Sequence, residues 1–152
     1  MWPCLLLILA LLHIVPTSHP APCQPQGVPE AEAIPKPRYA VVNKLRTYTC
    51  AQKYCRDVYR GQLASVHSAS RNEELWKLAR TYTYRSVWIG AFTSKRAGKW
   101  ESRWEDSSPW NYANWATAYP CHIFTTCAVL STRDGLWRSR TCCSLRPFIC
   151  QY

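Results

Sequence analysis

The sequence is poor in acidic residues, in glycine and in long apolar runs. It has 9 Asp and Glu against 19 Lys and Arg, and only 5 Gly in 152 residues. No glycine-rich phosphate-binding loop occurs, which excludes that type of nucleotide site. No Asn-x-Ser/Thr triplet occurs either, so N-glycosylation is not expected. After residue 15 no apolar stretch approaches the roughly 20 residues needed to span a bilayer.

A catalytic constellation is also missing. His67 and His122 lack the partner residues that indicate nucleophilic catalysis, so a structural role is the simpler interpretation. The neighbouring carboxylates of Glu105 and Asp106 do not by themselves indicate a glycosidase. We therefore expect a binding protein that is not an enzyme and has no cofactor.

The first residues have the features of a targeting segment. The apolar run from Leu5 to Leu12 is too short to cross a membrane but fits the hydrophobic region of a signal peptide. We expect residues 1–20 to be a signal peptide and residues 21–38 to be a Pro-rich linker or short propeptide. The expected location is outside the cell or in a secretory granule.

Nine cysteines in so short a chain indicate an oxidising compartment. Cleavage near residues 18–21 removes Cys4 and leaves an even number, which suits complete pairing. The remaining eight are Cys23, Cys50, Cys55, Cys121, Cys127, Cys142, Cys143 and Cys150. Zinc binding is the alternative, but secretion favours disulfides.

The positive charge lies in the second part of the chain. From Tyr39 onward there are 17 Lys and Arg against 7 Asp and Glu, and 12 of the 17 are Arg. Such a surface attracts sulfated glycans, anionic membranes or nucleic acid. The alternative is a charge that only keeps the protein soluble, but Arg binds sulfate and phosphate through two hydrogen bonds at once, which favours the first interpretation.

Residues 39–152 predict one α+β domain with two helices, short antiparallel strands and one long loop. A strand is expected over residues 39–42, then a helix capped by Thr49 that ends near Arg60 at Gly61. Residues 63–66 alternate like a strand. Ser70 and Glu73 form a capping box that begins a second helix. Further strands are expected at residues 87–90, 127–130 and 148–150, with the long loop at about 93–126.

The order of motifs in this region resembles the C-type lectin-like domain family. These motifs are Gly61-Gln62-Leu63-Ala64-Ser65-Val66-His67-Ser68, Trp88-Ile89-Gly90, Trp104-Glu105-Asp106, Asn114-Trp115, Trp137 and Pro147-Phe148-Ile149-Cys150. Within the family, the likeness is greatest to the group of eosinophil major basic protein and bone marrow proteoglycan. That likeness comes from the Cys55-Arg56-x-x-Tyr59-Arg60-Gly61 motif, the tryptophan-rich run at 104–115, Trp137-Arg138 and the basic charge.

The resemblance implies two disulfides, Cys55 with Cys150 and Cys127 with Cys142. The first would close a loop of about 95 residues and contribute roughly 4–5 kcal/mol in the chain-entropy model. The other four cysteines allow three pairings, and they are Cys23, Cys50, Cys121 and Cys143. Neighbouring Cys142 and Cys143 should have different partners.

The resemblance also indicates where lectins of this family bind calcium, and this chain lacks those ligands. A Glu-Pro-Asn or Gln-Pro-Asp triplet is replaced by Tyr119-Pro120-Cys121, and an Asn-Asp pair after a tryptophan is replaced by Arg138 and Ser139. Calcium requires several oxygen ligands, most of them carboxylates or carbonyls. We therefore expect no metal at this position and no sugar bound through calcium.

Two groups of basic residues remain as candidate binding residues, with two aromatic residues beside them. The resemblance implies that both groups lie towards one end of the domain, although solvated surface charge would explain each residue individually. The candidates are Lys95, Arg96, Lys99, Arg103, Arg133, Arg138, Arg140, Trp110 and Tyr119. Trp100 is a further candidate for stacking on a sugar ring.

The expected function is calcium-independent binding of heparin, heparan sulfate or other anionic surfaces, including membranes, by a secreted protein of innate defence. Specific nucleic-acid binding is not expected. The linker contains only Glu30 and Glu32, whereas precursors of the basic-protein group have strongly acidic propeptides. The alternatives are a lectin for neutral glycans and a structural protein associated with matrix or mineral.

Overall fold

The computed structural model describes residues 35–152, so the expected signal peptide and most of the linker lie outside the described residues. Within this range the chain forms two helices and seven strands, which confirms the α+β class. In chain order they are β1 (Tyr39–Arg46), α1 (Tyr48–Tyr59), β2 (Gln62–Leu63), α2 (Ala69–Tyr82), β3 (Val87–Arg96), β4 (Lys99–Trp104), β5 (Thr126–Leu130), β6 (Trp137–Arg140) and β7 (Arg146–Gln151).

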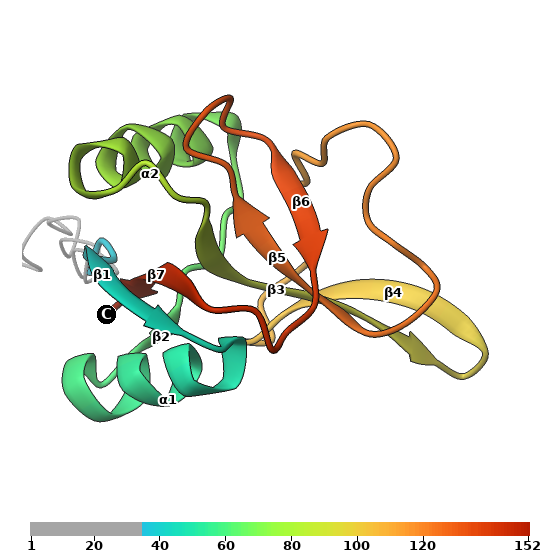
Figure 1. Ribbon diagram of the computed structural model, residues 1–152. Coiled ribbons are helices and arrows are strands. Elements are labelled where there is room, and N and C mark those ends of the chain that lie inside the picture. Colours follow the sequence, from blue (N-terminus) through green and yellow to red (C-terminus); the bar gives the residue numbers. More distant parts are fainter. Residues whose placement is uncertain (1–34) are drawn as a thin grey trace, which may run out of the picture. The chain divides into compact units, whose positions relative to one another are not determined.

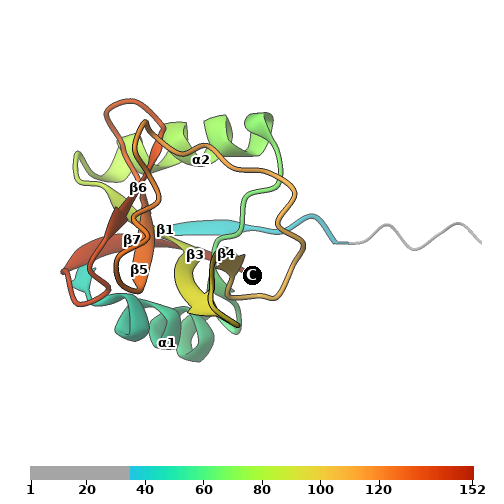
Figure 2. The same cartoon turned by 90° about the vertical axis from the view of Figure 1, so that its right-hand side faces the viewer.

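All strands belong to one sheet with the order β1-β7-β3-β5-β6, while β2 pairs with β7 and β4 pairs with β3. The pairs are antiparallel except β3 with β7, which run parallel where Trp88 lies opposite Phe148. The sheet is therefore mixed, with the expected antiparallel pairs and one parallel pairing besides them. Helices α1 and α2 lie on opposite sides of the sheet (Figures 1 and 2).

Helix α1 begins and ends differently from the sequence-based expectation. Its N-cap is Thr47, whose hydroxyl accepts a hydrogen bond from the Cys50 amide, so Thr49 lies inside the helix. The left-handed C-cap residue is Arg60, with φ 57°. Gly61 is needed for a different reason, because a Cβ there would lie 1.9 Å from the Gln151 carbonyl oxygen.

Helix α2 begins two residues earlier than expected. Ser68 is its N-cap and accepts a hydrogen bond from the Arg71 amide, whereas Ser70 already lies within the helix. A cap must have extended backbone so that its side chain can reach the first free amides, and Ser68 meets this condition with φ −158°. Asn72, Leu75 and Ala79 form the buried face.

The expected long loop is shorter than the sequence predicted, because its first part is a β-hairpin. Strand β3 continues to Arg96 and turns back into β4, through Ala97 and Gly98, which both have positive φ. The hairpin projects away from the two helices (Figure 1). Charged and aromatic side chains obscured its periodicity, and β6 was missed for the same reason. The irregular segment runs from Glu105 to Thr125.

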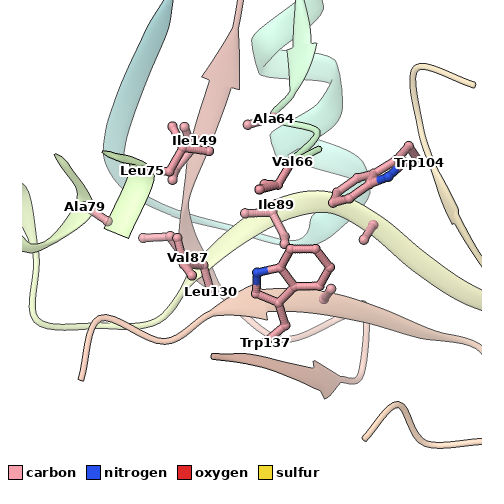
Figure 3. Close-up of a cluster of buried hydrophobic side chains, with 12 residues drawn as sticks. Ala64, Val66, Leu75, Ala79, Val87, Ile89, Trp104, Leu130, Trp137 and Ile149 are labelled. Atoms are coloured by element: carbon pink, nitrogen blue, oxygen red, sulfur yellow. The ribbon is translucent and has the colours of Figure 1, made fainter. Parts of the chain in front are cut away.

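Hydrophobic side chains fill both faces of the sheet. Trp88 packs towards α1 with Phe148, whereas Ile89 packs towards α2 with Trp137. Figure 3 shows Ile89 and Trp137 side by side in the cluster on the α2 side. Since successive strand residues point to opposite faces, burial on both sides explains the apolar run at the start of β3. Within residues 35–152, no helix is long and apolar enough to cross a membrane.

Two disulfides join the chain as the resemblance implied, Cys55 to Cys150 and Cys127 to Cys142. The expectation of complete pairing is not met among the described residues. Cys50 and Cys143 are exposed thiols and Cys121 is a half-buried thiol. An even count does not bring cysteines within bonding distance, because that depends on the fold. Cys23 lies outside the described residues.

Candidate anion-binding face

The structure divides the candidate basic residues between two separate hollows. Arg133, Arg138 and Arg140 line the first, which has a volume of about 260 Å³. Arg96 and Arg103 line the second, together with Trp110. Lys95 and Lys99 lie exposed at the end of the hairpin beside the second hollow.

The first hollow is positively charged because side chains alternate between the two faces of β6. Trp137 and Ser139 point inward and are buried, so the alternate residues Arg138 and Arg140 share the outer face. Arg133 comes from the turn between β5 and β6. Hydroxyl-bearing residues complete the wall, namely Tyr84, Ser86, Ser131 and Thr132.

Arg138 is held by a carboxylate on the same face. Its Nη1 and Nη2 donate to the two oxygens of Asp134 at 3.0 and 2.7 Å. These hydrogen bonds hold the pKa of Asp134 well below its ordinary value of 3.8. The pair therefore remains charged over the whole neutral range, and Arg138 contributes less free positive charge than the sequence indicated.

Two further arginines, Arg85 and Arg146, were not among the candidate residues predicted from the sequence. Burial lowers the pKa of Arg146, and the positive charges of Arg140 and Arg85 lower it further. Arg46 lies directly opposite Arg146 on β1. Like charges in such proximity repel one another, and an anion would relieve the repulsion. No local motif could reveal this group of arginines, because its members come from three segments that are far apart in the sequence.

We call this surface the arginine face and define it by Arg85, Arg133, Arg138, Arg140 and Arg146. Among residues 35–152, Asp134 is the one carboxylate in an ion pair with any of these five. The other ion pairs of the described chain lie on the two helices, and they involve Asp57, Glu73 and Glu74.

The two tryptophan candidates pack on other rings. Trp110 is half-buried and packs on Trp104, with ring centroids 5.0 Å apart. Trp100 stacks in parallel on His122 at 6.1 Å. The hydroxyl of Tyr119 lies 3.4 Å from Arg140 Nη1, so this residue borders the arginine face.

A direct hydrogen bond joins the two segments that hold calcium in lectins of this family. The Cys121 amide donates to the buried Ser139 hydroxyl at 3.0 Å. These are two of the positions at which carboxylate or amide oxygens are replaced in this chain. Within residues 35–152 there is no group of three or more His, Cys, Asp or Glu side chains that could hold a metal ion.

The fold and the disulfides define the class of protein. The family model for the lectin C-type domain matches residues 44–152, and the chain belongs to this family. Its relatives are binding proteins that are not enzymes.

Particular relatives narrow the assignment. The chain is 40% identical over 115 residues to bone marrow proteoglycan of Mus musculus, which covers 76% of this chain and 52% of that protein. It is 38% identical over 128 residues to proteoglycan 3 of Mus musculus, covering 84% of this chain and 55% of that protein. Eosinophil granule major basic protein 1 of Cavia porcellus is 36% identical over 119 residues, which cover 75% of this chain and 50% of that protein. The chain thus spans about half the length of these curated relatives.

Solved structures agree with this fold. The cow CD23 carbohydrate-recognition domain superimposes with a TM-score of 0.67 and 26% identity, covering 78% of this chain and 89% of that one. A calcium-independent type II antifreeze protein superimposes with a TM-score of 0.65 and 25% identity, covering 76% of this chain and 85% of that one. The fold is therefore shared with proteins that differ in what they bind, so the site residues must indicate the ligand.

Proposed function

We propose that this protein is a secreted or granule-stored C-type-lectin-like protein that binds sulfated glycosaminoglycans, such as heparin and heparan sulfate, without calcium. The carrying observation is the arginine face. Arg133, Arg138 and Arg140 line one hollow, the charges of Arg140 and Arg85 act on Arg146, and Asp134 is the one carboxylate ion-paired with this face among the described residues. Arg binds sulfate with two parallel hydrogen bonds, so a sulfated chain lying across the face would engage several side chains at once.

The similarity to eosinophil granule major basic proteins and proteoglycans supports a role in innate defence within the secretory pathway. The hydrogen bond from the Cys121 amide to the Ser139 hydroxyl supports calcium independence, because it uses the side-chain oxygen of Ser139, which stands where the family pattern has a calcium ligand. The exposed Lys95, Arg96 and Lys99 form no ion pair among the described residues and offer a second basic area for a long polyanion.

Heparin chromatography of the secreted chain tests the proposal. Arg140→Ser with Arg146→Ser should lower heparin affinity at physiological salt by about tenfold, because two charged contacts are lost. The control Arg56→Ser with Lys77→Ser removes the same charge from the two helices and should have a much smaller effect. Elution should be the same with calcium and with chelator.

Equal effects of the two double variants would contradict a site on the arginine face. A chelator effect would contradict calcium independence. Retention that survives high salt would instead favour the neutral-glycan alternative, which has weaker support because Trp110 is packed against the core. The matrix-associated alternative stays open, and tissue of expression would separate it.

A further inference from the structure

A third hollow adjoins the first along the turn between β5 and β6. It has a volume of about 320 Å³ and lies where this turn meets the end of α2. Its lining residues are Arg80, Thr83, Tyr84, Thr132 and Arg133. Tyr84, Thr132 and Arg133 also line the first hollow, so the two hollows share a wall. A ligand that extends beyond the first hollow can therefore enter the third directly.

Tyr84 belongs to the shared wall, and it is 85% exposed although its backbone is fixed. The Tyr84 carbonyl accepts a hydrogen bond from Thr132 Oγ1 at 2.7 Å, and Trp76 Nε1 donates to the Thr132 carbonyl at 2.9 Å. These bonds hold the segment after α2 against the β5–β6 turn, which runs beside α2 (Figures 1 and 2). The aromatic ring is therefore presented to solvent from a rigid segment, and a ligand that contacts it does not have to order the backbone.

The guanidinium groups near this wall are placed by aromatic rings rather than by carboxylates. The Cζ atom of Arg85 lies 5.6 Å from the centroid of the Tyr84 ring, and that of Arg80 lies 5.0 Å from the Trp76 ring. Among residues 35–152, Arg80, Arg85 and Arg133 form no ion pair. A guanidinium over an aromatic face can still donate from its N–H groups, and these are the groups that bind sulfate in pairs.

The exposed ring sets the kind of ligand that fits. A single exposed aromatic side chain needs no explanation by itself. Tyr84, however, lies between two hollows whose other lining residues all carry guanidinium or hydroxyl groups. A sulfated sugar combines the two matching features, because its ring has an apolar face that packs on an aromatic ring and its sulfate groups accept hydrogen bonds. A small inorganic anion would use only the charged groups.

We propose that a sulfated glycan chain runs from the first hollow across the Tyr84 ring into the third hollow, with one sugar packed on the ring and sulfate groups on Arg80 and Arg133. The inference rests on the proposed function and deepens it, because it gives the chain a path and a minimum length. A disaccharide would occupy one hollow, whereas a longer oligosaccharide reaches both. The second contact of a longer chain then costs no further loss of translational freedom.

The test compares a heparin disaccharide with a heparin octasaccharide by isothermal titration calorimetry. The octasaccharide should bind the unmodified protein more tightly by about tenfold, because it engages both hollows. Tyr84→Ala should weaken octasaccharide binding by about tenfold while leaving the net charge unchanged. Tyr82→Ala is the matched control, because this tyrosine is also exposed, at 56%, and ends α2 but lines neither hollow. The control should bind the octasaccharide like the unmodified protein.

A second pair of variants tests the charge in the third hollow. Arg80→Gln should reduce the advantage of the octasaccharide over the disaccharide, because Arg80 lines the third hollow and not the first. Lys44→Gln is the control with the same change in charge. Its ammonium also lies over an aromatic ring, that of Tyr54 at 5.4 Å, and it lines neither hollow. This control should leave the ratio of the two affinities unchanged.

Equal affinities for the two oligosaccharides, or equal effects of the Tyr84 and Tyr82 variants, would overturn the proposed path. Loss of heparin retention in Arg140→Ser with Arg146→Ser, together with full octasaccharide binding by Tyr84→Ala and Arg80→Gln, would keep the proposed function and reject the path. No binding of either oligosaccharide would contradict both proposals. Because Tyr84 and Arg80 are exposed, their variants should unfold at the same temperature as the unmodified protein, which thermal unfolding checks.

Discussion

Among individual residues, Asp134 has the largest effect on the charge of the arginine face. It binds Arg138 through both carboxylate oxygens, and neither side chain is deeply buried, with relative exposures of 31% and 22%. Exposed ion pairs contribute little to stability. The main consequence of the pair is therefore electrostatic, because it neutralises one of the five positive charges of the arginine face.

Replacing Asp134 by Asn should increase heparin affinity several-fold, because Arg138 is released and a repelling charge is removed. The salt concentration at elution from heparin would measure this. Glu73→Gln, which frees Lys77 on α2, is the control with the same change in charge. Unchanged elution of Asp134→Asn would show that a sulfated chain does not contact this part of the face.

The same residue predicts a small pH dependence of stability. The pKa of Asp134 is depressed in the folded protein, so the pair stabilises the fold above pH 3.8, the ordinary value for the unfolded chain. This contribution is lost as the pH falls towards the depressed pKa. Asp134→Asn should therefore reduce the loss of thermal stability between pH 5 and acidic pH, and identical acid profiles would contradict the assignment.

Among the elements, the connection from α1 to β2 depends on close backbone approach. Arg60 closes the helix in the left-handed conformation, and Gly61 then passes directly over the Gln151 carbonyl of β7. The residue after the helix is therefore glycine because of a neighbouring strand, rather than because of the helix end. Sequence patterns near helix ends do not distinguish these two reasons.

Gly61→Ala should destabilise the protein by about 3 kcal/mol, because the added Cβ would overlap backbone that cannot rotate away. Thermal unfolding would measure this, with the secreted yield as a second readout. Gly98→Ala is the control, since no atom lies within 4 Å of its Cβ and the cost is about 1 kcal/mol of strain at φ 80°. Similar losses in both variants would contradict the close approach.

For the whole molecule, the two disulfides act on loops of very different length. Cys55–Cys150 joins residues 95 apart, whereas Cys127–Cys142 joins residues 15 apart. The first ties α1 to the strand at the chain's end, and the second ties the start of β5 to the turn after β6. A cross-link restricts the unfolded chain more when it closes a longer loop.

Removing both cysteines of the long bridge should therefore cost about 4.7 kcal/mol, against about 3 kcal/mol for the short bridge, in the chain-entropy model. Chemical denaturation of the two Cys→Ser double variants would measure the difference. Cys55, Cys150 and Cys127 are buried and Cys142 is half-buried in the same core cluster, so both double variants open space in one part of the core. A larger loss for the short bridge would show that strain or local packing, rather than loop length, decides their contributions.

The sequence by itself determined the class of fold and the two helices, and its resemblance to a known family implied the two disulfides. Periodic apolar positions, capping residues and the order of the Trp, Gly and Cys motifs can be recognised in the sequence without knowledge of the fold. The pairing of β6, the extent of the β3–β4 hairpin and the parallel contact of β3 with β7 were not predicted. Strand pairing depends on residues far apart, so composition and local alternation do not specify it.

The tertiary structure alone decided which charges act together. The sequence predicted two basic groups, but the fold placed them at separate hollows and brought the charges of Arg85 and Arg140 to act on Arg146. It also paired Arg138 with Asp134 and left the Trp104 nitrogen without an acceptor. Net charge is a sum that sequence gives directly, whereas an interaction between charges depends on distance and on burial, which exist only once the chain has folded.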